Sequence, residues 1–258
     1  MQTEGPVPDR YSRQVLFAGL GAEGQRALMR SRVAIVGCGG LGSTQASLLV
    51  RAGVGLVRLI DRDAVDETNL HRQILYDEAD ATGLEPKATI AARKLREVNS
   101  QVRVEGLAAE LNAATVGDLL ADVDVILDAC DNFATRYVIN DFAVKMSIPW
   151  VHGGCVASYG MTFAVVPGET ACLRCVFAAP PPRELTPTSE DVGVIGPIVV
   201  AIAALQTAEA LKLAAGRREA LSHKITTVDL WQNTCEQIDL PPADPRCPCC
   251  GERRFDYL

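Results

Sequence analysis

The amino-acid sequence predicts an α/β fold built on a mostly parallel sheet, which antiparallel strands extend in the C-terminal half. Three observations lead to this prediction. Short β-branched apolar runs alternate with helical segments, a glycine-rich turn follows the first run, and the character of the chain changes after Pro149. Continuous apolar runs are typical of strands that are buried on both faces of a parallel sheet. The 258 residues suffice for one large domain of this class.

The first β-α-β unit occupies residues 33–60. Val33–Val36 is a short β-branched run, and the turn Gly37–Gly42 follows it at once. A helix with apolar residues at positions i, i+7, i+8 and i+11 comes next, and Gly53 and Gly55 end it before the strand at 56–60. A unit of this length predicts two parallel strands joined by a right-handed crossover.

The alternation continues along the rest of the chain. Before Pro149 we expect helices over 87–98 and 133–146 and strands over 102–104 and 123–127. After it we expect strands over 150–152, 161–166, 226–230 and 235–240, a Pro-rich loop over 179–191 and an Ala-rich helix over 198–215. The last two strands are expected to form an antiparallel pair. Because no repeat or clear linker divides the chain, we expect one domain.

Composition excludes several classes of partner. Acidic side chains outnumber basic ones by 32 to 25, so the net charge is −7 and no basic excess is available to hold nucleic acid or an anionic membrane. No apolar run approaches the ~20 residues that span a bilayer. The polar segment 1–10 does not resemble a secretory signal. We therefore expect a cytoplasmic protein that binds neither nucleic acid nor membranes.

The glycine-rich turn lies where the first strand meets the first helix. Gly37, Gly39 and Gly42 have the G-x-G-x-x-G spacing, and Gly40 adds a fourth glycine. Such a turn lets the backbone approach a phosphate, while the helix N-terminus supplies free N–H groups. Asp61, at the end of the next strand, is placed to bind ribose hydroxyls. The pattern predicts a nucleotide site rather than a turn kept for packing, but it does not separate NAD from ATP.

The polar residues that follow Asp61 favour a triphosphate. Asp63 precedes the segment Asn69–Gln73, which contains Arg72, and Lys87 opens the next predicted helix. Two cations can hold the negative charges of a triphosphate through charge-assisted hydrogen bonds of ~1.5–3 kcal/mol each. Either cation alone is more simply explained as a solvated surface residue. Both of them together, beside this turn, favour phosphate binding.

Further acidic residues follow the strand expected at 123–127. Asp128, Asp131 and Asn132 come after its carboxyl end, where ligands bind in open α/β sheets. Mg²⁺ in proteins is typically held by one or two carboxylates together with substrate phosphates. We therefore predict that Asp131 binds Mg²⁺. The alternative, in which Asp131 or Asn132 caps the following helix, is compatible with metal binding.

Nine cysteines are an odd number, and a reducing cytoplasm disfavours structural disulfides. Cys172 and Cys175 form one C-x-x-C pair, and a second group at 247–250 follows after 71 residues. Two such pairs supply the four thiolates of a closed, structural zinc site, against the alternative of unliganded buried thiols. Cys247 and Cys250 have the right spacing and leave Cys249 as a spare. Whether Cys249 replaces one of them stays open.

The remaining cysteines and the histidines indicate no additional site. We interpret four cysteines as small buried packing residues, namely Cys38, Cys130, Cys155 and Cys235. The three histidines, His71, His152 and His223, show no metal-binding spacing. His71 is the only one inside a motif, and we interpret it as structural.

Taken together, these motifs resemble the ThiF/MoeB/HesA family of ubiquitin-like-protein activating enzymes. The resemblance spans Tyr11 to Gly251 and rests on ordered motifs: Arg10–Gln14, the Gly37–Gly42 turn, Asp61-x-Asp63, Asn69–Gln73, Lys87, and Asp128-x-x-Asp131-Asn132-x-x-Thr135-Arg136. It implies a Rossmann-like adenylyltransferase that forms one domain over residues 1–258. Within that domain it implies an N-terminal helical segment (1–30), a nucleotide-binding half (31–150) and a half that binds the carrier and zinc (151–258).

The resemblance also implies a reaction, in which ATP adenylates the C-terminal Gly-Gly carboxylate of a small ubiquitin-like sulfur carrier and pyrophosphate leaves. Such carriers serve molybdopterin, thiamine, tRNA-thiolation and cysteine pathways. Lys87 and Arg72 would act on the phosphates with Asn69, Asp131 would bind Mg²⁺, and Arg13 would reach the γ-phosphate from the other subunit of a homodimer. The implied nucleotide-binding set is Gly37, Gly39, Gly40, Gly42, Asp61, Asp63, Asn69, Arg72, Gln73, Lys87, Asp131 and Asn132. The resemblance gives the same four zinc ligands.

One departure from the family concerns sulfur. Members that handle sulfur often carry a reactive cysteine shortly before a Gly-Val-x-x-Pro segment, which here is Gly193–Pro197. The loop 179–191 contains no cysteine, and Ser189 lies near the expected place with a hydroxyl that substitutes poorly for a thiolate. This puts a thioester or persulfide step in doubt. We expect that sulfur comes from a separate donor protein, or that the adenylate itself is the product that is handed over.

Two other functions are weighed against adenylation. An NAD-dependent Rossmann oxidoreductase would explain the glycine turn and Asp61, but not Asn69–Gln73, Lys87 or the cysteine pairs. A non-catalytic, carrier-binding adaptor would explain the missing loop cysteine. It would not explain why all the residues implied in phosphate and Mg²⁺ binding are present.

Overall fold

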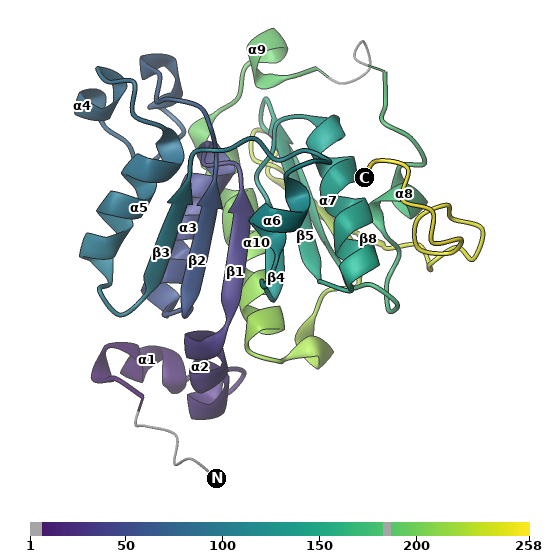
Figure 1. Ribbon diagram of the computed structural model, residues 1–258, viewed down its shortest axis with the longest axis horizontal. Helices are drawn as coiled ribbons and strands as arrows, with labels where there is room; N and C mark the ends of the chain where they lie inside the picture. Colours follow the sequence, from purple (N-terminus) through teal and green to yellow (C-terminus); the bar gives the residue numbers. More distant parts are fainter. Residues whose placement is uncertain (1–6, 183–186) are drawn as a thin grey trace.

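The computed structural model describes residues 7–182 and 187–258. One eight-stranded sheet runs through the described chain in the order β3-β2-β1-β4-β5-β6-β7-β8 (Figure 1). Alternate residues of the central strands face two separate clusters of buried apolar side chains, as Val33 and Ala34 do in neighbouring positions. Helices therefore cover both faces of the sheet, which confirms the predicted α/β class.

The parallel half of the sheet begins with the predicted β-α-β unit. It consists of β1 (Arg32–Val36), α3 (Gly40–Ala52) and β2 (Leu56–Ile60), and β2 then pairs in parallel with β3 (Arg103–Leu107). Between them, α5 (Lys87–Val98) occupies the predicted range. The prediction for β3, residues 102–104, was too short and began one residue early, because β3 pairs with β2 along its whole length.

The middle of the sheet is formed by β4 (Val125–Asp128), α7 (Phe133–Met146) and β5 (Trp150–Val156). The strand predicted over 123–127 begins two residues later, because its ladder with β1 starts at Val125 and runs through Asp128. The last three strands are β6 (Tyr159–Val165), β7 (Lys224–Asp229) and β8 (Thr234–Asp239), and each pairs antiparallel with the strand before it. This confirms the antiparallel extension of the sheet and the pair predicted for the last two strands. Every residue of β8, which forms the edge of the sheet, is exposed.

Short helices complete the described chain. They are η1 (Asp9–Tyr11), α1 (Ser12–Val15), α2 (Gly21–Arg30), η2 (Glu67–Asn69), α4 (Glu78–Ala81), α6 (Val116–Leu120), α8 (Leu173–Val176), α9 (Ser189–Val192) and η4 (Arg218–Ala220). The presence of α9 corrects the prediction of a continuous loop over 179–191, because a capping box at Thr188 and Asp191 stabilises a helical turn. Residues 1–6 and 183–186 of the predicted segments lie outside the described residues.

The helix α10 (Gly196–Ala214) corrects the expectation that no apolar segment approaches the length needed to span a bilayer. It has 19 residues and is long and apolar enough, by length and composition alone, to cross a membrane. In the structure it packs against α3, β5 and β6, and it buries Ile198 and Ile202. Its buried Gln206 donates a hydrogen bond to the Asp128 carbonyl at 2.8 Å. These contacts identify α10 as a core helix.

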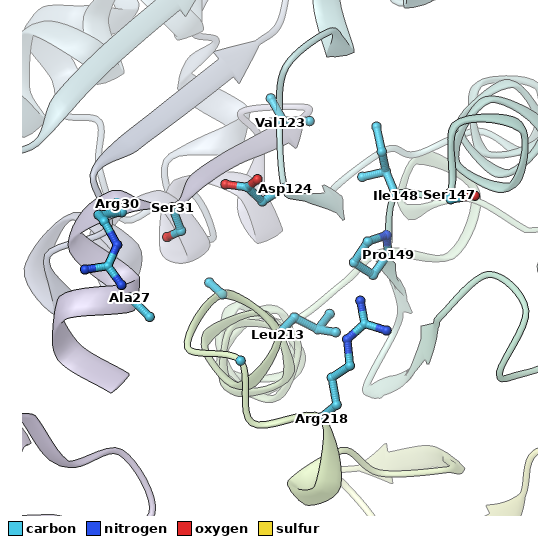
Figure 2. A pocket seen from close by; sticks show the side chains of 12 residues that line it. Ala27, Arg30, Ser31, Val123, Asp124, Ser147, Ile148, Pro149, Leu213 and Arg218 are labelled. Carbon is cyan, nitrogen blue, oxygen red and sulfur yellow. The ribbon is translucent and has the colours of Figure 1, made fainter. Parts of the chain in front are cut away.

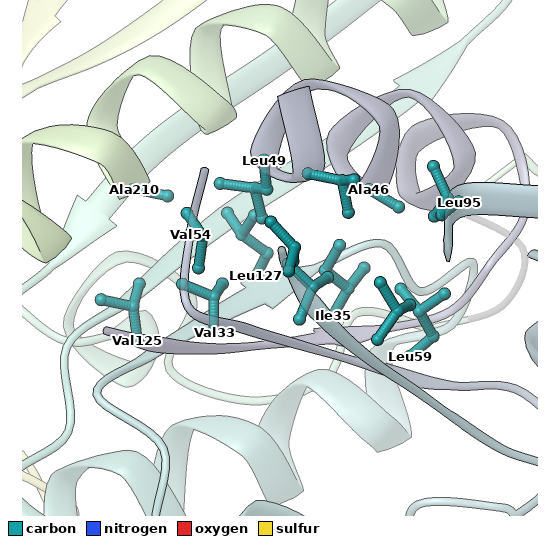
Figure 3. Packing of buried hydrophobic residues seen from close by; sticks show 14 of the residues in the cluster. Val33, Ile35, Ala46, Leu49, Val54, Leu59, Leu95, Val125, Leu127 and Ala210 are labelled. Carbon is teal, nitrogen blue, oxygen red and sulfur yellow. The ribbon is translucent and has the colours of Figure 1, made fainter. Parts of the chain in front are cut away.

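The larger apolar cluster holds α3 and α5 against the parallel strands (Figure 3). Ile35 and Leu59 from the strands, Leu49 from α3 and Leu95 from α5 are all fully buried. Burial of each such side chain stabilises the fold by ~1.5–3 kcal/mol. Because α3 is packed against the sheet in this way, its N-terminus and the glycine turn are held rigidly at the carboxyl ends of the parallel strands.

Candidate functional site

The glycine turn connects β1 to α3 at the carboxyl edge of the parallel strands. Gly37 has a φ of +98°, and a Cβ there would collide with the Ala129 carbonyl oxygen, so packing alone requires this glycine. At Gly39 the only heavy atom of the described residues that a Cβ would meet within 4 Å is Gln73 Nε2, at 3.6 Å. Space is therefore left beside the N-terminus of α3, where N–H groups without helical partners can bind an anion.

Asp61 lies directly after β2 and contacts the glycine turn. Its Oδ2 accepts a hydrogen bond from Cys38 N at 2.6 Å, and its Oδ1 accepts one from Asp63 N at 2.8 Å. Burial raises the pKa of Asp61, although these two bonds and the nearby Lys87 ammonium act against that shift. A carboxylate has about four acceptor positions. Two of them therefore stay available for ribose hydroxyls.

Lys87 is the first residue of α5 and lies close to Asp61. Its backbone N–H donates to the Asp63 carbonyl at 2.7 Å, and its side chain is only 7% exposed. Within residues 7–182 and 187–258, its ammonium group forms no hydrogen bond or ion pair. The Tyr76 hydroxyl bridges the Cys38 carbonyl (2.9 Å) and the Lys87 carbonyl (3.3 Å). The ammonium lies near the Asp61 carboxylate, whose pKa it lowers, and none of its three N–H groups has a hydrogen-bond partner in the described chain, so they can bind an anionic ligand.

The segment Asn69–Gln73 faces the glycine turn. Gln73 is buried, and its Nε2 donates to Asn69 Oδ1 at 2.5 Å, while its Oε1 has no hydrogen-bond partner among the described residues. A Cβ on Gly40 would lie 3.3 Å from the Arg72 carbonyl oxygen, which shows how close the two segments are. The Arg72 side chain is half-buried and donates to the Thr68 carbonyl at 3.0 Å.

The turn between β4 and α7 packs on the same edge of the sheet. Ala129 N donates to the Val36 carbonyl at 2.9 Å, which ties this turn to the end of β1. Asn132 caps α7, because its Oδ1 accepts a hydrogen bond from Thr135 N at 2.9 Å. The helix cap is therefore Asn132 and not Asp131. The Asp131 carboxylate is exposed and contacts only the Asn132 side-chain amide, at 3.2 Å, among the described hydrogen bonds.

Among the described residues that were predicted to act on the nucleotide, Arg13 is the one that lies away from the carboxyl ends of the parallel strands. Its helix α1 is anchored at the far end of α3, where Gln14 Nε2 donates to the Ala52 carbonyl at 2.9 Å. The 13 residues of α3 separate that end from the glycine turn, which corresponds to about 20 Å at 1.5 Å per residue. Figure 1 shows α1 beyond the end of the sheet from which β1 starts.

The four predicted zinc ligands meet at one point. Cys172, Cys175, Cys247 and Cys250 have all their Sγ atoms within 4.8 Å of one another. The separations are 3.9 Å for Cys172–Cys175, 3.6 Å for Cys172–Cys247 and 3.4 Å for Cys175–Cys250. A tetrahedral site with Zn–S bonds of ~2.3 Å requires S···S distances of about 3.8 Å. The cluster therefore fits zinc, and it selects Cys250 over Cys249.

The other thiols have different surroundings. Cys249 is buried and accepts a hydrogen bond from Asn140 Nδ2 at 3.3 Å. Burial raises the pKa of Cys38 and Cys130 well above the ordinary value and that of Cys155 to about 12, so these thiols stay protonated and unreactive. The interpretation of Cys235 as a buried packing residue was wrong, because it lies on the exposed edge strand β8.

A hollow of about 580 Å³ lies at the amino ends of the parallel strands, at the opposite end of the sheet from the glycine turn (Figure 2). It is lined by residues that directly precede β1, β4 and β5, such as Ser31, Asp124 and Pro149, and by Arg218. Because the nucleotide-site residues follow the carboxyl ends of the parallel strands, this hollow is not part of that site.

The fold, the glycine turn and the adjacent Lys87 ammonium together define a nucleotide-binding α/β protein. The model of the ThiF family matches residues 11–249. The chain belongs to the ThiF family. This finding confirms the family and, with the relatives described next, the predicted class of adenylyltransferase.

Similar proteins include three curated relatives. The sulfur carrier protein ThiS adenylyltransferase of Bacillus subtilis is 45% identical over 96% of this chain and 73% of its own length. The sulfur carrier protein adenylyltransferase of Thermus thermophilus is 37% identical over 95% and 91%, and the SAMP-activating enzyme E1 of Haloferax volcanii is 37% identical over 97% and 91%. Among solved structures, E. coli MccB with ATP shares 26% identity and a TM-score of 0.81 over 94% of this chain and 75% of MccB.

The sequence did not identify every residue that shapes the site. Asp128 and Arg136 belong to one of the family motifs, but the sequence predicts no function for either of them. For His152 the sequence shows only that its spacing does not fit a metal site. The structure places these three side chains together beneath the β4–α7 turn. The one signal for them in the sequence is an acid at the end of an apolar strand, because a buried carboxylate requires partners.

Proposed function

We propose that this chain transfers AMP from ATP to the C-terminal Gly-Gly carboxylate of a small ubiquitin-like sulfur-carrier protein and releases pyrophosphate. The observation that carries the proposal is the position of Lys87, whose ammonium lies near the glycine turn and Asp61 and forms no hydrogen bond or ion pair within the described chain. The names of the relatives, and the structure of MccB with ATP, support ATP as the nucleotide.

The reaction needs positioning and charge neutralisation rather than a protein nucleophile. A carrier carboxylate oxygen forms a bond to the α-phosphorus, while the bond from that phosphorus to the pyrophosphate oxygen breaks. In the proposal Asp61 holds the ribose, and Asn69, Arg72 and Lys87 hold the phosphates. Asp131, next to Asn132, would hold Mg²⁺, which neutralises phosphate charge when it is bound. Precise placement of the two reactants supplies most of the acceleration.

Exchange of radiolabelled pyrophosphate into ATP tests this function. We expect exchange when the enzyme is mixed with purified ubiquitin-like carriers that end in Gly-Gly, and none with the same carriers lacking the last glycine. Calorimetry with Mg-ATP and with NADH separates the other functions. Binding of NADH but not of Mg-ATP would indicate an oxidoreductase. Binding of Mg-ATP and carrier without exchange, across a full panel of carriers, would indicate an adaptor.

We also propose a homodimer in which Arg13 acts on the γ-phosphate bound by the partner subunit. Support comes from the position of α1, which lies about one helix length from the glycine turn of its own chain. In a two-fold dimer, a helix at that end of one subunit is free to approach the site of the other.

Mixing two inactive variants tests this arrangement. In a heterodimer of Arg13→Ala and Asp131→Ala, action in trans leaves one site with both residues intact and one site with neither. We therefore expect about half of the wild-type exchange per dimer, whereas each homodimer is inactive. A purified, verified heterodimer that stays inactive would show that Arg13 acts within its own subunit or not at all.

The proposal also covers domain organisation, the source of sulfur and location. Residues 1–258 would act as one adenylation domain, with the nucleotide in the half over 31–150 and the carrier and zinc in the half over 151–258. The sequence of the loop 179–191 contains no cysteine, so sulfur would come from a separate donor protein. Nine free cysteines suit a reducing compartment, and we propose a cytoplasmic location.

A further inference from the structure

Three ionisable side chains meet beneath the turn that carries Asp131, and none of them would touch substrate in the proposed reaction. Asp128 is fully buried, and its Oδ2 accepts hydrogen bonds from Arg136 Nε at 3.1 Å and from His152 Nδ1 at 2.9 Å. Burial opposes ionisation of Asp128, but Arg136 and the His152 hydrogen bond outweigh it and lower the pKa of Asp128. Because the carboxylate can only accept, His152 Nδ1 must carry the donated proton.

This cluster fixes both peptide groups of Cys130, the residue before Asp131. Asp128 Oδ1 accepts from Cys130 N at 2.9 Å, and Arg136 Nη2 donates to the Cys130 carbonyl at 2.6 Å. On the other side of Asp131, Asn132 is held as the cap of α7. The backbone of Asp131 is therefore held on both sides, although its carboxylate is exposed.

His152 is itself held firmly. It belongs to β5, is 2% exposed, and has its ring packed against Phe163 with centroids 4.8 Å apart and against Trp150 with centroids 6.0 Å apart. Arg136 also donates to the carbonyl of Gly153, the next residue of β5, at 3.1 Å. Loss of the imidazole donor would leave a buried carboxylate short of one bond, and the Asp128–Arg136 pair would then be free to shift.

We propose that His152 is a positioning residue which, through Asp128 and Arg136, holds the Cys130 peptide groups so that Asp131 meets the Mg²⁺-triphosphate in a single orientation. The inference rests on the proposed function, because it assigns Asp131 a metal-bound nucleotide as its ligand. It adds a residue from β5 to a site that is otherwise built from the parallel strands and their turns.

Calorimetry of ATP binding, with and without saturating Mg²⁺, tests the inference without any carrier. Wild-type protein is expected to bind ATP more tightly when Mg²⁺ is present. In His152→Leu, which lacks the donor, this gain should fall about tenfold, at the lower end of the 10- to 100-fold effects of residues that orient metal ligands. In His152→Asn, whose amide nitrogen can replace Nδ1, the gain should stay within about threefold of wild type. Affinity without Mg²⁺ should be nearly equal in all three.

Two further variants separate positioning from general damage. Val151→Ala shortens a fully buried residue next to His152 on the same strand, whose side chain belongs to a different apolar cluster from Trp150 and Phe163, and should keep the full Mg²⁺ gain even if it lowers thermal stability. Arg136→Lys keeps the charge but cannot make all three hydrogen bonds, and should lose the gain as His152→Leu does, which provides a second variant if the leucine protein does not fold.

The inference is overturned if His152→Leu and Arg136→Lys keep the gain, if His152→Asn is no better than His152→Leu, or if Val151→Ala loses as much. Failure of wild-type protein to bind ATP under either condition would instead overturn the nucleotide site, and this inference with it.

Discussion

Replacing Asp131 with alanine is expected to lower carrier-dependent ATP–pyrophosphate exchange by roughly 10²- to 10³-fold. Asp131 is the exposed carboxylate at the turn after β4, and that turn packs on the glycine turn at the edge where the phosphates would lie. Without it, Mg²⁺ would lose a protein ligand and charge would build up uncompensated on the departing pyrophosphate. The measurement is the exchange rate at saturating carrier, with ATP and Mg²⁺ each varied.

A matched control is Asp118→Ala, which removes an exposed carboxylate from the first turn of α6, outside the nucleotide site. We expect it to exchange at the wild-type rate. Thermal unfolding of Asp131→Ala should also match wild type, because the capping bond of α7 belongs to Asn132. An Asp131→Ala protein that keeps more than about a third of wild-type exchange would remove Asp131 from the machinery.

The parts of the fold that could be predicted were those that depend on local pattern. The β-branched run before the glycine turn defined β1 and, with it, the edge of the sheet that carries the site. The bounds of α7 were predicted to the residue, because an Asx cap begins the helix at Phe133 and Ser147 ends it in the left-handed region at φ +59°. Order and spacing of motifs likewise predicted which segments lie together, since all parallel strands place their carboxyl ends at one end of the sheet.

What could not be predicted depends on partners distant in sequence. The bounds of β3 and β4 are set by hydrogen bonding to the neighbouring strands β2 and β1. The local sequence of a strand does not show where its neighbours begin and end. His152 reaches Asp128 across 24 residues, and nothing near either residue indicates that contact. Cys235 looks like a core residue by type, but it is exposed because its strand is the edge of the sheet. Nothing in the sequence around Arg13 indicates that α1 lies about one helix length from the glycine turn.

Loss of one zinc ligand is expected to have the largest effect on stability. The cluster joins two segments far apart in the chain, one at α8 and one at 247–250, and both pack against the apolar cluster that contains α7. In Cys250→Ser we expect zinc content to fall from about one per chain to near zero, because four thiolates bind far more tightly than three. Stability should fall by ~4 kcal/mol or more, which lowers the Tm by on the order of 10 °C.

The adjacent cysteine supplies the control. Cys249 is fully buried but donates no sulfur to the cluster, so Cys249→Ser should keep about one zinc and lose far less stability. Metal analysis of both purified variants, beside thermal unfolding, decides the matter. Zinc retained in Cys250→Ser and lost in Cys249→Ser would mean that the ligand set is Cys172, Cys175, Cys247 and Cys249.

A closed set of four thiolates also limits what the metal does. With no open coordination position it cannot bind the carrier carboxylate or a phosphate, so its contribution to the reaction must pass through folding. Exchange by Cys250→Ser, measured well below its Tm and divided by the folded fraction, is therefore expected to stay within about twofold of wild type. A folded variant that no longer exchanges would instead show that the zinc segment shapes the carrier-binding half directly.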